Sequence, residues 1–150
     1  MKKYDFNLSN GNAFASEMAV ADMLAVTTAN GGTSAAVADF GGQSVAVAMG
    51  RDAKAIAEKG GFAAVAAGFM GRAVTHDNAV SVAVTRAETG KNGVAVSRAW
   101  VRGGEGAILI CFDHRCVPHV TRVSGEILPD TWYTWEEHGA RWRAAGEGEA

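Results

Sequence analysis

Hydrophobic residues in this chain alternate with small or polar ones in short phrases that recur along the sequence. The phrase Ser-Val-Ala-Val-Ala at residues 44–48 returns in related form at residues 62–66, 81–85, 93–97 and 106–110. A β-branched residue alternating with a small one has the period of two that is typical of a strand. Glycines fall between the phrases, where the chain can turn at little steric cost. We therefore expect a unit of one strand and one turn about every 9–10 residues, with two units to each coil.

This repeat predicts an all-β, single-domain β-solenoid, that is, a β-helix or β-roll of short rungs punctuated by glycine. After residue 110 the composition changes, because both prolines and three of the four tryptophans lie there. We expect these aromatic side chains to cover the apolar end of the last coil. The expected organisation is an N-terminal lead-in or edge strand at 1–12, a solenoid at 13–110, a cap built as a small β-meander or hairpin at 111–143, and a disordered tail at 144–150.

A helical interpretation is the alternative, because alanine is the strongest helix former. Three features argue against it. Glycine pairs interrupt the array, and each glycine costs a helix about 1 kcal/mol. The valines alternate instead of recurring at intervals of three and four. Segments between glycines are shorter than the roughly 11–12 residues of an average helix.

Both faces of the expected strands are apolar, which suggests that both are covered. We expect the valines to stack inside the coil and the flat alanine row to pack against another subunit. The chain is therefore expected to form a homo-oligomer, with a trimer favoured. A monomer whose alanines face water is the alternative, since an alanine at a surface needs no explanation. The expected interface residues are Ala46, Ala48, Ala83 and Ala95.

Basic residues fall mostly at or beside the expected turns, which a regular solenoid would align into a ridge. Such a ridge could contact a partner, and aromatic residues of the cap could add to the contact. A solvated edge of mixed charge, with tryptophans packed in the core, is the alternative. The net charge of −2 creates no strong field, so nucleic acid is not expected as a partner. The candidate residues are Arg51, Lys54, Arg72, Arg86, Lys91, Arg98, Arg102, Trp132 and Trp135.

One cluster has the residue types of a metal site: Cys111, His114, Cys116 and His119. Zinc favours thiolate and imidazole ligands, but its common sites separate two ligand pairs by a longer loop. Two half-buried thiols with solvated histidines are the other interpretation. The same residues could form a Cys–His nucleophile pair, yet the sequence marks neither an orienting third group nor a cleft. We expect no bound metal, no cofactor and no enzymatic activity.

The repeat and the C-terminal segment each carry a resemblance. Ser-Val-Ala-Val-Ala followed by Gly-Arg-Asp-Ala-Lys-Ala, at residues 44–55, resembles the heads of trimeric autotransporter adhesins, although their repeat is about 14 residues long. The segment Val-Ser-Gly-Glu-Ile-Leu-Pro-Asp-Thr-Trp-Tyr-Thr at residues 123–134 is more specific. Together with the array before it, this segment resembles a group of uncharacterised bacteriophage and prophage proteins, which carry Val-Asp-Gly-Glu-x-Ile-x-x-Asp-Thr-Trp-Tyr before a short hairpin.

This resemblance implies a phage-borne protein and assigns no catalytic residue. A non-enzymatic, oligomeric interaction protein is the function we expect, and inhibition of a host defence system is one concrete form of it. A fibre, decoration or adhesin-head protein is the structural alternative, and a small metal-binding protein is the second. No signal peptide and no apolar run long enough to cross a membrane are recognised. The expected location is therefore the host cytoplasm, with the virion as the alternative.

Overall fold

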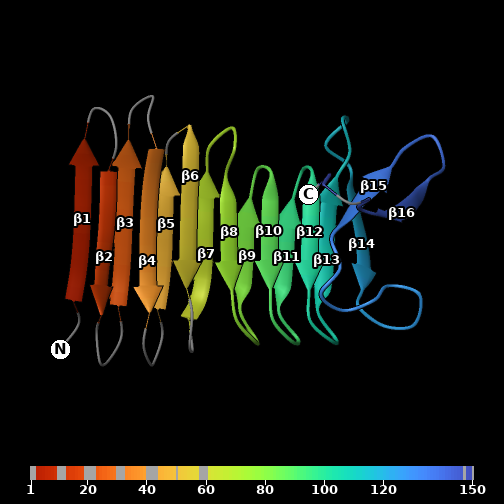
Figure 1. Cartoon of the computed structure of the whole chain (residues 1–150), viewed down its shortest axis with the longest axis horizontal. Coiled ribbons are helices and arrows are strands. Elements are labelled where there is room, and N and C mark those ends of the chain that lie inside the picture. The colour runs from red at the N-terminus through yellow and green to blue at the C-terminus, as the bar shows by residue number, and fades with distance from the viewer. Residues whose placement is uncertain are drawn as a thin grey trace.

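The computed structural model describes residues 3–9, 13–18, 23–29, 33–39, 44–49, 51–57, 61–146 and 148–149. Within them the chain forms β-strands and no helix, and the strands stand side by side along the long axis of the molecule (Figure 1). The strands are β1 (Lys3–Ser9), β2 (Ala13–Met18), β3 (Met23–Ala29), β4 (Thr33–Asp39), β5 (Ser44–Met49), β6 (Asp52–Ala57), β7 (Gly61–Ala67), β8 (Arg72–Thr75), β9 (Val80–Ala83), β10 (Arg86–Thr89), β11 (Val94–Ser97), β12 (Trp100–Gly103), β13 (Ile108–Phe112), β14 (Pro118–Arg122), β15 (Tyr133–Glu136) and β16 (Arg141–Ala144).

Successive strands alternate between two eight-stranded sheets. Sheet A has the order β1-β3-β5-β7-β9-β11-β13-β14, and sheet B has the order β16-β15-β12-β10-β8-β6-β4-β2. Strands two apart along the chain pair in parallel, as β7 does with β9 and β8 with β10. This is a β-solenoid with two strands to each coil, so the predicted fold class is confirmed. The parallel stack already includes β1, which lies in the expected lead-in.

The coils become shorter towards the C-terminal end. Leu24 of β3 pairs with Val45 of β5, whereas Val80 of β9 pairs with Val94 of β11, so the later coil contains fewer residues. The pairing of β11 with β13 has the same short offset as that of β9 with β11. In these short coils one corner repeats with the same backbone: Asn78, Asn92 and Gly106 have φ values of 57°, 54° and 75°. Glycine and asparagine adopt this left-handed conformation at the lowest cost, so their recurrence fixes the corner.

Alanine, not valine, fills the interior of the coil. Ala55, Ala73, Ala87 and Ala95 are 0% exposed. The expectation that valines would face inward and alanines outward was wrong: the alternating burial along the strands places the smaller row inside, where it lets the two sheets pack closely. The oligomer interface expected on the alanines is therefore not available: Ala48, Ala83 and Ala95 belong to the chain's own core, and the side chain of Ala46 lies outside the described residues.

Buried hydroxyl groups connect the two sheets across this narrow interior. Ser81 of sheet A donates to the carbonyl oxygen of Ala73 at 3.0 Å and accepts from the backbone N–H of Glu88 at 3.1 Å, and both of these partners lie on sheet B. Thr75 and Thr89 of adjacent coils bond to each other at 3.1 Å. Each buried hydroxyl thus has a partner, which avoids the cost of roughly 1–3 kcal/mol for an unsatisfied polar group.

The cap reverses the direction of the chain at the C-terminal end of the molecule (Figure 1). Strand β14 pairs antiparallel with β13 in sheet A, and the β15–β16 hairpin joins β12 of sheet B antiparallel. Larger side chains close the interior here: Val101, Leu109, Val123 and Tyr133 are at most 4% exposed. The expected strand near 117–123 and the turn near 136–139 are confirmed, whereas residues 127–128 form no strand. Of the aromatic residues expected to cover the last coil, Tyr133 lies in the core and Trp142 packs against it.

Candidate interaction surfaces

The outer face of sheet A carries the valines that the coil excludes. They line up in register from strand to strand, and the described ones are half-buried or exposed. The row continues into the cap, where Val120 is 61% exposed. A second row beside it ends at Ile108, which is 39% exposed. The first row consists of Val47, Val65, Val82, Val96, Ile110 and Val120, and the second contains Val45, Val80, Val94 and Ile108; together they are called the apolar face.

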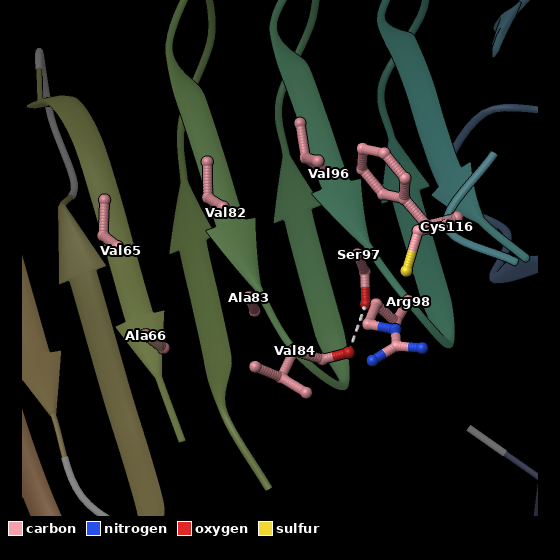
Figure 2. Close-up of a pocket in the computed structure, with 10 residues that line it drawn as sticks. Val65, Ala66, Val82, Ala83, Val84, Val96, Ser97, Arg98 and Cys116 are labelled. Atoms are coloured by element: carbon pink, nitrogen blue, oxygen red, sulfur yellow. Dashed lines mark hydrogen bonds between the residues drawn. The ribbon is translucent and has the colours of Figure 1, made fainter. Parts of the chain in front are cut away.

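A groove of about 390 Å³ lies at the edge of the apolar face where the sheet A strands end. Figure 2 shows three of its lining residues, Val65, Val82 and Val96, in a row on adjacent strands. Phe112 and Cys116 line the end of the groove nearest the cap, and Arg98 supplies its one charged group. Most of the lining is apolar, and the Ser97 hydroxyl is already bonded to the carbonyl oxygen of Val84, so the groove favours an apolar side chain over a polar ligand.

The outer face of sheet B has the opposite chemistry. Lys54, Arg72 and Arg86 are register partners on β6, β8 and β10, and Trp100 continues the row. In the neighbouring row, Glu88 is bonded to Arg102 and lies 3.6 Å from Arg72. Three cations thus lie on adjacent rungs, about 4.8 Å apart. The cationic face is defined here as Lys54, Arg72, Arg86, Arg102 and Arg143 together with Trp100 and Trp132.

The predicted partner residues are divided among different parts of the molecule. Arg72 and Arg86 are the first residues of β8 and β10, beside turns as expected, whereas Lys54 and Arg102 lie within strands of sheet B. Arg98 lines the groove on sheet A, while Arg51 and Lys91 are exposed in turns. Trp132 lies beside Arg102, whose guanidinium is 5.1 Å from the ring centre. Trp135 is packed in the cap, stacked on His119 with ring centres 3.9 Å apart.

Two members of the cationic face were missed in the sequence. Trp100 follows Arg86 at the same interval as Arg86 follows Arg72, so the period of the short coils would have found it. Arg143 lies with its guanidinium 5.5 Å from the ring centre of Trp100. Nothing in the sequence indicates this second contact, because it depends on the antiparallel return of β15 and β16.

The predicted metal cluster is not assembled. Cys111 points into the coil, where its thiol lies 3.7 Å from the carbonyl oxygen of Ala99, and burial raises its pKa. Cys116 is exposed on the following turn. His114 and His119 are bonded to different carboxylates, Glu137 and Asp113. Across the described residues, no three His, Cys, Asp or Glu side chains are arranged to hold a metal ion.

Acid–histidine pairs instead hold the turns of the cap, beside a cavity of about 470 Å³. Glu137, on the β15–β16 turn, accepts from the backbone N–H of His114 at 2.9 Å and bonds its ring nitrogen. These bonds lower the pKa of Glu137, and the same carboxylate raises the pKa of His114. Asp113 accepts from the backbone N–H of Val117 and bonds His119 at 3.1 Å, which lowers the pKa of Asp113.

The His114–Glu137 pair should make the contact between the β13–β14 turn and the β15–β16 hairpin depend on pH. The contribution of His114 is complete below about pH 6.5 and is lost as the pH rises through its raised pKa. The contribution of Glu137 is complete above about pH 4.3 and is lost as the pH falls through its lowered pKa. We expect amide exchange in the β15–β16 hairpin, corrected for intrinsic rates, to be slowest between these values.

Two substitutions check this pH dependence. Glu137→Gln should lower the midpoint of the His114 titration observed by NMR and flatten the pH dependence of exchange. Glu136→Gln is the matched control, because Glu136 pairs with Arg141 at 2.8 Å instead of a histidine. A His114 midpoint that is the same in wild type and Glu137→Gln would contradict the assignment.

Comparison of the chain with protein-family models, curated proteins and solved structures finds no match. The class of protein is therefore defined by the fold alone, a two-sheet β-solenoid with an antiparallel cap. A search of the described residues for a helix long and apolar enough to span a membrane finds none.

Proposed function

We propose that this chain is a non-enzymatic interaction protein that self-associates through its apolar face and binds an acidic protein partner through its cationic face. The observation that carries the proposal is the contrast between the two outer faces of one coil. One sheet presents valine and isoleucine in register over successive strands, and the other presents three cations in register. Two faces of different chemistry suit two different contacts.

The size of the apolar face supports self-association. Its described part crosses the six strands from β5 to β14 of sheet A. At about 4.8 Å between strands and 3.3 Å per residue, it covers roughly 400 Å² in projection. A single apolar patch of about 300–600 Å² is the largest that a typical monomer exposes, and such patches commonly mark binding sites. A homo-oligomer, with a trimer favoured, would remove this surface from water.

The charge pattern supports an acidic protein rather than nucleic acid as the second partner. Nucleic-acid-binding domains commonly have a pI above about 9, whereas this chain has a net charge of −2 and a pI of about 6.1. Arginine side chains form two parallel hydrogen bonds with a carboxylate.

The biological role we propose is that of a phage-borne inhibitor of a host defence complex, acting in the host cytoplasm. The resemblance of residues 123–134 to phage and prophage proteins supports the setting, and the cationic face supplies a surface that could block an acidic target. The test is plaque formation by a restricted phage on bacteria that carry a defence system and express the chain.

Charge reversal on the cationic face tests this role. Arg72→Glu combined with Arg86→Glu should abolish protection, because two attractive contacts become repulsive. Arg51→Glu combined with Lys91→Glu changes the net charge equally at turns away from this face and should leave protection intact. Equal protection by both variants would contradict the assigned surface. Absence of protection by the wild type in every defence-bearing host tested would contradict the inhibitor role itself.

One observation favours a second candidate, a structural protein of the virion or an adhesin-like head. The spacing of the last coils, from Val80 to Val94 to Ile108 on successive strands of sheet A, equals the repeat length of the adhesin heads that residues 44–55 resemble. Mass spectrometry of purified phage particles separates the candidates. Stoichiometric presence in particles would favour the structural role, and absence would remove it.

A further inference from the structure

One turn of the solenoid presents an exposed apolar tip. Phe69 and Met70, between β7 and β8, are 79% and 56% exposed. Two hydrogen bonds hold the backbone of this turn. The backbone N–H of Met70 donates to the carbonyl oxygen of Arg51 at 2.9 Å, and the hydroxyl of Thr85 donates to the carbonyl oxygen of Phe69 at 2.8 Å. Two large apolar side chains are thus held in water on a rigid support. Burying each would contribute about 1.5–3 kcal/mol.

The groove on the apolar face begins beside this turn, on the same edge of the molecule. Val65 and Ala66 of β7 form its near end, and Phe112 and Cys116 form its far end. Between them, the corners after β9 and β11 are only two residues long, at 84–85 and 98–99. The longer segments at 68–71 and 113–117 therefore flank the groove on both sides. Phe69 and Met70 are not part of its lining, so the chain's own tip leaves the groove unfilled.

We propose that the groove of one copy receives the Phe69–Met70 tip of a second copy. An apolar tip and an apolar groove on the same chain are complementary surfaces, and such a pair joins one copy to another. The contact rests on the proposed self-association and identifies the residues that make it. It also continues the apolar face, because Val65, Val82 and Val96 belong to both surfaces.

The native Cys116 makes this contact directly testable. It is exposed and lines the groove, while Cys111 is buried. Position 70 lies in the turn between β7 and β8, and position 116 lies in the turn after β13. Within one chain of the Met70→Cys variant, the two positions are therefore about three rungs, or about 14 Å, apart. A disulfide requires Cα atoms within about 7 Å. A bond between positions 70 and 116 can therefore form only between two copies.

Mild oxidation of Met70→Cys should give disulfide-linked multimers on a non-reducing gel. They should form at least about tenfold faster than in the controls, because docking raises the local thiol concentration. The controls are wild type, Met70→Cys with Cys116→Ser, and Leu128→Cys, which places a thiol at a site that is 58% exposed on the cap. Peptide mapping must show the 70–116 bond. Multimers that form equally fast in Leu128→Cys, or that lack this bond, would overturn the proposal.

Light scattering separates this inference from the proposed function. Phe69→Asp should lower the mass of the assembly, and Leu128→Asp should not. A wild-type mass of 15.6 kDa would refute self-association and this contact together. If the wild type assembles, but oxidised Met70→Cys forms no 70–116 bond and Phe69→Asp leaves the mass unchanged, only the contact between the tip and the groove is refuted.

Discussion

Ala95→Leu is expected to lower the melting temperature by about 2–12 °C. Ala95 is 0% exposed on β11, between its register partners Ser81 and Leu109. A larger side chain would force the two closely spaced sheets apart, and overpacking of this kind costs about 1–3 kcal/mol. At this chain length each kcal/mol corresponds to about 2–4 °C. Thermal unfolding followed by circular dichroism measures the effect.

Val96→Leu provides the matched control for this prediction. The neighbouring residue Val96 lies on the outer face of the same strand and is half-buried. Its replacement should change stability by no more than about 0.5 kcal/mol. A destabilised Val96→Leu together with an unaffected Ala95→Leu would restore the original expectation that the valines face inward.

Val82→Asp is expected to convert the proposed homo-oligomer into a monomer of 15.6 kDa. Val82 lies in register between Val65 and Val96, near the middle of the apolar face. Assembly would bury the new carboxylate without a partner, and an uncompensated buried charge costs about 3–5 kcal/mol. The dissociation constant should therefore rise at least 100-fold, by about 1.4 kcal/mol for each tenfold step. Light scattering over a dilution series gives the mass.

The same substitution on the opposite sheet is the control. Val74 is half-buried on the outer face of sheet B, beside Arg72. Val74→Asp should leave the mass unchanged, because this face is assigned to a different partner. Loss of assembly in both variants would mean that the charge disrupts the coil itself, and retention of assembly in Val82→Asp would contradict the role of the apolar face.

The sequence predicted the strands, the corners and the winding because these depend on local alternation and glycine position. It did not predict which row turns inward. Alternation separates two faces of a strand, but when both are apolar, hydrophobicity does not choose between them. The smaller row faces inward over most of the coil, which lets the two sheets approach closely enough for the Ser81 hydroxyl to reach the carbonyl oxygen of Ala73 at 3.0 Å.

The candidate sites illustrate the same limit. The four candidate metal ligands are close in sequence: Cys111, His114, Cys116 and His119. The structure separates them, because β13 directs Cys111 inward and the turn between the antiparallel strands β13 and β14 carries Cys116 outward. The cations of sheet B could be found individually, but their alignment depends on coil length. Only the constant length of the short coils places Arg72, Arg86 and Trp100 in one row.

The reversal at β14 also determines how copies of this chain can add to one another at the C-terminal end. The parallel ladder stops at β13, whose outer side is already occupied by an antiparallel strand that begins with Pro118. Proline lacks the N–H that a further ladder bond would need. A second molecule therefore cannot add to β13 as the next parallel rung, because that edge is already paired within the chain.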